Sequence, residues 1–211
     1  MALFKEWKTG QYGRAAIWKI EESDAIAGLT DIHLLQTSDE QSRAAYLVAC
    51  AVLVQLDEDF PVDAIYSDEQ GKLRTANNEY FFSIAHAWPY VAVMMDAHSE
   101  TGIAILKLPE NVEGLKQQYI SAEEEGLFHN DKQLLTLACT AKEAVVKWCS
   151  LTNLNMTGDI SIEQFYNVRD KYEMVIYLKP LKMPQMVFVE NLIAADVACS
   201  WVYKAQDWAI Y

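Results

Sequence analysis

The stretch that most constrains the fold reads "ACTAKEAVVKW", residues 138–148. Most of its side chains are apolar, but two lysines and a glutamate interrupt the apolar pattern. Glu143 and Lys147 are four positions apart, so on a helix they share a face and can form an ion pair with the acid nearer the N-terminus. Thr140 and Glu143 have the spacing of a capping box. The stretch therefore predicts a long helix, from about residue 131 to residue 149.

A second long apolar run lies in the first half of the chain, at residues 44–56, and follows the polar cluster "TSDEQSR". Ser38 is a candidate N-cap for this run, with Gln41 three residues later. We therefore expect a helix from about residue 39 to residue 55.

Strand candidates accompany each long helix. Runs rich in β-branched and aromatic residues are separated by turn-prone residues, which is typical of strands. One long helix with about three strands occurs twice, which predicts an α+β fold of two similar halves, residues 1–100 and 101–211. We expect each half to pack its helix on a mainly antiparallel three-stranded sheet. The expected strands are residues 14–20, 64–68, 80–87, 90–96, 101–108, 172–179, 185–191 and 197–204, and short helices are expected at residues 112–118 and 122–127.

The composition is that of a folded, acidic protein. Of its 211 residues, 52% are hydrophobic and 11% are aromatic, which places the chain among globular proteins. The formal net charge of −13 opposes non-specific attraction to nucleic acid and to anionic membranes. Neither is an expected partner.

The apolar segments and the cysteines predict a soluble, cytoplasmic protein. The opening "MALFKEWKTG" has no apolar core of signal-peptide length, and the run at residues 44–56 is too short to span a bilayer. The cysteines stand in apolar surroundings without a CxxC pair, so we expect reduced core residues. They are Cys50, Cys139, Cys149 and Cys199.

Four short motifs follow one another along the chain: "GK" at residues 71–72, "FFSIAHA" at 81–87, "TGIAIL" at 101–106 and "TAKEAVVK" at 140–147. Their order and spacing resemble the landmarks of the 4'-phosphopantetheinyl transferase superfamily, which read approximately GKP, F-[ST]-x-SHS, G-[IV]-D-x-E and W-[TS]-x-KE-A-x-x-K. The resemblance extends to the opening "IWKIEES" and ends at about residue 155. The rest of the chain contributes strands and no further motif.

The resemblance implies two pseudo-symmetric α+β halves that bind magnesium and coenzyme A between them. In the family, the serine hydroxyl of an apo acyl or peptidyl carrier protein attacks the β-phosphate of coenzyme A. The phosphopantetheine arm moves to the serine, and 3',5'-adenosine bisphosphate leaves. Motif matching implies that Glu143 is a metal ligand or base, that Lys147 steadies the diphosphate, and that Lys72 and His86 contact coenzyme A phosphates. Cations and a metal suit such a reaction, because it depends chiefly on positioning and charge neutralisation.

The sequence departs from the family motif at the metal site. Ala104 and Leu106 stand where the family has its two metal carboxylates. On a strand both positions point to the same side, which would present a methyl and an isobutyl group to the ion. Magnesium is usually held by carboxylates and substrate phosphates, so Glu143 alone would be a poor site. Ile103 and Ile105 make the opposite side apolar too, which predicts a strand buried on both sides.

Three functions are consistent with these residues. The first is an active transferase, and the second is a catalytically silent relative that binds coenzyme A, a carrier protein or another partner. The third is a protein that keeps the fold and acts through surface contacts alone. In "MMDAHSE", Asp96, His98 and Glu100 alternate. They could form a replacement site on one strand face, but we favour a solvated turn between two strands.

Overall fold

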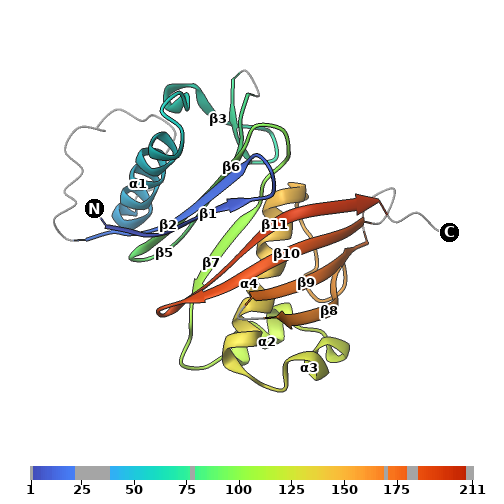
Figure 1. Ribbon diagram of the computed structural model, residues 1–211. Coiled ribbons are helices and arrows are strands. Elements are labelled where there is room, and N and C mark those ends of the chain that lie inside the picture. The colour runs from blue at the N-terminus through green and yellow to red at the C-terminus, as the bar shows by residue number, and fades with distance from the viewer. Residues whose placement is uncertain (1, 22–38, 77–78, 169–170, 180–184, 208–211) are drawn as a thin grey trace. The chain divides into compact units, whose positions relative to one another are not determined.

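The computed structural model describes residues 2–21, 39–76, 79–168, 171–179 and 185–207 (Figure 1). The chain divides into two compact units, Met1–Ile103 and Ala104–Tyr211, which we call the N-terminal unit and the C-terminal unit. Both contain helices and antiparallel sheet, so the expected α+β class is confirmed.

A four-stranded antiparallel sheet forms the centre of the N-terminal unit, with strand order β1-β2-β6-β5. The helix α1 (Glu40–Leu56) packs on it, and its fully buried Leu53 lies in one apolar cluster with Val93 and Phe82 of the sheet. Burial of each such side chain contributes roughly 1.5–3 kcal/mol. The strands are β1 (Ala2–Thr9), β2 (Gly13–Lys19), β5 (Phe81–Ala87) and β6 (Tyr90–Asp96).

A small hairpin of β3 (Ile65–Ser67) and β4 (Leu73–Thr75) completes this unit, after the 3-10 turn η1 (Val62–Ala64). The turn of the hairpin contains Gly71 with φ of +81°, a conformation that glycine adopts without steric cost. This turn places the following Lys72, the lysine of the "GK" motif, directly before β4.

The helix α1 begins one residue later than expected, because Asp39 is its N-cap. The Asp39 carboxylate accepts hydrogen bonds from the backbone N–H groups of Gln41 and Ser42, which have no partner within the helix. The expected cap, Ser38, lies outside the described residues.

The C-terminal unit has a five-stranded sheet with order β7-β11-β10-β9-β8. The helix α4 (Lys132–Cys149) crosses one face of this sheet (Figure 1), and its Ala138, Ala141 and Val145 are fully buried. The short helices α2 (Glu113–Tyr119) and α3 (Ala122–Phe128) precede α4 and lie within one residue of their expected positions. The strands are β7 (Ile103–Lys107), β8 (Ile160–Val168), β9 (Lys171–Leu178), β10 (Gln185–Ala194) and β11 (Val197–Asp207).

The expectation of two three-stranded sheets is wrong, since the sheets on which α1 and α4 pack have four and five strands. The strands β1 and β8 are not among the predicted strands, and both are terminal strands of their sheets. The terminal strands β5 and β7 were predicted because they carry buried apolar runs, whereas β1 and β8 expose polar residues such as Lys5, Glu6, Glu163 and Gln164, so their apolar alternation is weak. The hairpin strand β4 was also missed, because it has only 3 residues.

Of the helices in the described parts of the chain, none is both long and apolar enough to cross a bilayer. The cysteines are reduced, as expected: Cys50, Cys139 and Cys199 are buried and Cys149 is partly buried.

Candidate functional site

Lys142, on the opening stretch of α4, is a buried structural residue. Its side chain has 0% exposure, and its Nζ donates hydrogen bonds to the Glu124 carboxylate and to the backbone carbonyls of Tyr119 and Met156, each at 2.7 Å. These three acceptors match the three N–H donors of an ammonium group. Burial lowers the pKa of Lys142, while the Glu124 carboxylate acts in the opposite direction.

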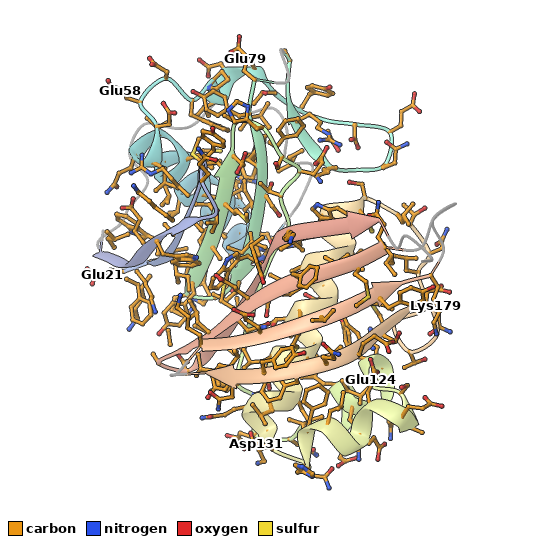
Figure 2. The ribbon with its side chains drawn as sticks, turned by 45° about the vertical axis from the view of Figure 1, so that its right-hand side comes forward. Glu21, Glu58, Glu79, Glu124, Asp131 and Lys179 are labelled. Carbon is orange, nitrogen blue, oxygen red and sulfur yellow. The ribbon has the colours of Figure 1, made fainter. Side chains whose placement is uncertain are left out.

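Both carboxylate oxygens of Glu124, the partner of Lys142, also accept hydrogen bonds from the backbone. Its Oε1 accepts from the backbone N–H of Ile162 at 2.7 Å, and its Oε2 accepts from that of Ser121 at 2.7 Å. The second contact belongs to a capping box at the start of α3. Glu124 lies on α3 (Figure 2), and its hydrogen bond with Ile162 connects this helix to the strand β8. The Lys142–Glu124 pair therefore fastens α3, α4 and β8 to one another.

Glu143, the next residue of α4, accepts a hydrogen bond from the hydroxyl of Tyr119. The distance between Tyr119 Oη and Glu143 Oε1 is 2.6 Å. Burial and this contact with a carboxylate raise the pKa of Tyr119, so the hydroxyl keeps its proton and acts as the donor. One oxygen of the expected metal ligand is thus occupied by a neutral group of α2.

Lys147 lies one helical turn after Glu143 and is partly buried. Burial lowers the pKa of Lys147, and the negative charge of Glu143 opposes this effect by favouring the ammonium form. The spacing predicted from the sequence therefore places an acid and a lysine close enough to interact electrostatically.

The predicted capping box of Thr140 and Glu143 is wrong, because Thr140 lies in the middle of α4, whose N-cap is Asp131. The Thr140 hydroxyl is buried. It donates to the backbone carbonyl of Leu137 at 2.9 Å and lies 2.6 Å from the Ser200 hydroxyl. Ser200 in turn donates to Asn191 Oδ1 at 2.6 Å. Thr140 therefore belongs to a buried hydrogen-bond network between α4, β10 and β11.

The residues at the family's metal position do not fit magnesium. Ala104 has 0% exposure and belongs to the apolar core of the C-terminal unit, against which Leu106 also packs. Ile103 and Ile105 have 0% and 2% exposure, which confirms that this strand is buried on both sides. Magnesium requires oxygen ligands, and Glu143 would supply the only carboxylate of the motif. Within the described ranges, no group of three or more His, Cys, Asp or Glu residues could hold a metal ion.

In the N-terminal unit, Lys72 takes part in an ion-pair network. Its Nζ lies 2.6 Å from Oε2 of Glu100 and 3.4 Å from the carbonyl oxygen of Thr101. Arg74 binds the other oxygen of Glu100 through Nη1, and its Nε lies 3.1 Å from Oδ2 of Asp68. Only 8% of the Lys72 side chain is exposed.

His86 is exposed on β5, near the N-terminus of α1. Its Nε2 lies 3.4 Å from the hydroxyl of Ser42, which also donates to the Asp39 carboxylate. Hydrogen bonds from Ser42 lower the pKa of Asp39, and the charge of His86 adds to this effect. His86 is therefore placed beside a helix N-terminus, where the backbone dipole favours negative charge.

Asp96, His98 and Glu100 do not converge. Asp96 Oδ1 accepts from the backbone N–H groups of His98 at 2.7 Å and of Ser99 at 3.0 Å, which closes a turn after β6. The His98 ring packs edge-on against Tyr12, at 4.5 Å between ring centroids. The favoured turn interpretation is supported, although Glu100 has a separate role with Lys72.

A pocket of about 710 Å³ lies in the C-terminal unit, between α3 and the strands β8, β9 and β10. Its wall includes Glu123, Glu124, Glu163 and Lys179. Ser161 donates a hydrogen bond to Glu163 at 2.6 Å, and Lys179 donates one to the carbonyl of Gly158 at 2.9 Å. None of the residues expected from the motifs lines this pocket.

Tyr119, Glu124 and the role of Glu100 were not predicted from the sequence. The spacing of Ser121 and Glu124 is that of a capping box, and this signal could have marked Glu124. For Tyr119 and Glu100 the sequence offers no comparable signal, because their partners are 24 and 28 positions away.

No model of a known protein family matches the chain, and no curated protein sequence matches it. The likeness to the phosphopantetheinyl transferases therefore rests on the four motifs alone.

Proposed function

We propose that this protein is a catalytically silent relative of the 4'-phosphopantetheinyl transferases that binds coenzyme A without a metal ion. One observation carries the proposal: Ala104 lies in the apolar core at the position of a metal carboxylate, while Glu143 is bound by the Tyr119 hydroxyl. A binding function needs cations for the phosphates, but it does not need the metal that the transfer reaction requires.

Basic residues would hold the phosphate groups of coenzyme A. Lys147 is partly buried on α4, and in the N-terminal unit Lys72 and Arg74 already bind the carboxylate of Glu100. Lysine and arginine bind phosphate and carboxylate through the same charge-assisted hydrogen bonds. His86 would add a further donor beside the N-terminus of α1. An acyl or peptidyl carrier protein remains a second expected partner.

Mass spectrometry and thermal unfolding test the proposal together. The protein is incubated with coenzyme A, magnesium and several apo carrier proteins, and the carrier masses are followed. We expect no phosphopantetheine mass gain. In parallel, coenzyme A should raise the unfolding temperature equally with magnesium and with a chelator, because a ligand bound only by the native state stabilises it.

Lysine variants identify the contacts. Lys147→Ala and Lys72→Ala should each reduce the temperature shift given by coenzyme A. The matched control is Lys132→Ala, which removes an equal charge from an exposed position at the start of α4. If coenzyme A causes no shift in the parent protein, the proposed function is wrong, and action through surface contacts alone is favoured.

An active transferase is the second candidate. It is favoured by the retained spacing of Glu143 and Lys147 on α4, where the negative charge of the glutamate acts on the lysine. A phosphopantetheine mass gain on any carrier protein would establish this function and exclude the silent one.

A further inference from the structure

Two cations of the N-terminal unit converge on a single carboxylate. Glu100 presents Oε2 to Lys72 Nζ and Oε1 to Arg74 Nη1, so each oxygen binds a different cation. The Lys72 and Arg74 side chains are 8% and 20% exposed, whereas that of Glu100 is 34% exposed. The carboxylate is thus the more accessible member of the group, and it lies over two partly buried cations.

Asp68 orients the guanidinium of Arg74 and fixes the backbone at Lys72. Its Oδ2 binds Arg74 Nε at 3.1 Å, which leaves Nη1 directed at Glu100. Its Oδ1 accepts from the backbone N–H of Lys72 at 2.8 Å, which holds the hairpin turn closed. Arg74 Nε is therefore held by Asp68, and Lys72 Nζ has a further contact with the carbonyl oxygen of Thr101 at 3.4 Å, so each cation also has a contact that does not involve Glu100.

We propose that Lys72 and Arg74 form a phosphate-binding position whose internal occupant is the carboxylate of Glu100, so that Glu100 determines how tightly this position binds a phosphate group. The assignment of coenzyme A as the natural source of that phosphate rests on the proposed function. The position itself does not, because inorganic pyrophosphate carries the same chemistry.

The charges explain why Glu100 controls affinity. Lys72 and Arg74 contribute two positive charges, and Asp68 and Glu100 contribute two negative charges, so the position is neutral overall. An incoming phosphate must displace Glu100 and then experiences its repulsion at close range. Removal of this one charge leaves a net positive position with an arginine and a lysine already oriented, and both suit phosphate.

Isothermal titration with pyrophosphate and with coenzyme A tests the inference on the full chain. Glu100→Gln should bind both ligands about tenfold more tightly than the parent, because a factor of this order lies between the repulsion of two close unit charges in bulk water and that near a protein surface. Glu69→Gln is the matched control, because it removes an equal charge from an exposed position of the same hairpin turn and should bind like the parent. Lys72→Met added to Glu100→Gln should abolish the gain.

A second variant, Glu100→Asp, tests the inference if Glu100→Gln fails to fold. Glu100→Asp keeps the charge but is one methylene shorter, so it cannot reach both cations. It should show a smaller gain in pyrophosphate affinity, with circular dichroism confirming the native fold.

The outcomes separate this inference from the proposed function. If Glu100→Gln gains affinity for pyrophosphate while no variant binds coenzyme A, the phosphate position stands and the proposed function fails. If the parent and Glu100→Gln bind coenzyme A equally well, the proposed function stands and the inference is overturned. Equal pyrophosphate binding by the parent, Glu100→Gln and Glu100→Asp also overturns the inference. Glu100 then has only a structural role, which is to stabilise the hairpin through its ion pairs.

Discussion

Lys142 and Glu124 form an ion pair in the core of the C-terminal unit, with 2.7 Å between the ammonium nitrogen and the carboxylate and with side-chain exposures of 0% and 3%. All three ammonium protons and both carboxylate oxygens are engaged in the hydrogen bonds described above. A buried pair of this kind is stable only when its remaining donors and acceptors are satisfied. The hydrogen bonds of the Lys142–Glu124 pair therefore explain how a lysine can occupy the apolar stretch from residue 138 to residue 148.

Loss of Lys142 should destabilise the protein strongly. Lys142→Met leaves the Glu124 carboxylate buried without a counter-charge, which costs about 3–5 kcal/mol of the free energy of unfolding. Urea denaturation measures this loss. The control is Lys132→Met at an exposed position of the same helix, and the double variant Lys142→Met with Glu124→Gln should lose less than the single one. A loss under about 1 kcal/mol for Lys142→Met would show that the pair contributes little.

Introducing the carboxylates of the phosphopantetheinyl transferase motif should not create a metal site. Ala104→Asp with Leu106→Glu places carboxylates in the apolar core of the C-terminal unit, where Ala104 has 0% exposure. We expect a loss of several kcal/mol, because a buried charge without a partner is costly. Urea denaturation with and without magnesium measures both effects, and Leu106→Met is the apolar control. Stabilisation of the double variant by magnesium would contradict the statement that this position does not fit the ion.

The buried hydroxyl network between α4, β10 and β11 should contribute to stability. Ser200→Ala removes the donor to Asn191 Oδ1 and the partner of the Thr140 hydroxyl. A buried polar group left without a partner costs about 1–3 kcal/mol. The loss is measured by urea denaturation against Ser161→Ala, a serine on the strand β8 whose hydroxyl binds Glu163 in an exposed setting. Equal effects of the two substitutions would mean that the network adds nothing beyond an exposed contact.

Glu190 should make the protein less stable as the pH rises. Burial raises the pKa of Glu190 above the ordinary value of 4.5, Lys171 partly opposes this, and the neighbouring Glu173 adds to it. The native state therefore holds this proton at a pH where the unfolded state has lost it. The stabilising contribution is complete below about pH 4.5 and is lost as the pH rises through the folded-state pKa.

The variant Glu190→Gln tests this sign. It should unfold at a higher temperature than the parent at neutral pH, and the difference should shrink towards pH 4.5. Glu110→Gln, at an exposed position, is the control. A difference that grows on acidification would mean that the sign is wrong.

Local residue patterns were sufficient to predict the helices and strands in which those patterns are strong. The helix α4 was predicted from its apolar spacing and begins and ends within one residue of the prediction, and the buried strands β6 and β9 were found in the same way. Helix and strand periodicities are properties of neighbouring residues, so they can be read without knowledge of the fold. The α+β class follows from these elements.

The edge strands of the sheets and the partners of the polar residues depend on contacts between distant parts of the chain, so they could not be predicted from local patterns. The strands β1 and β8 became visible through pairing with β2 and β9, because their own sequences are those of exposed edges. Lys142 lies 18 positions from Glu124, and Lys72 lies 28 positions from Glu100. Spacing in a sequence does not encode contacts over such separations, since these depend on how the intervening elements pack. The motif residues could therefore be named from the sequence, but whether each lysine faces a carboxylate of its own chain was decided by the fold.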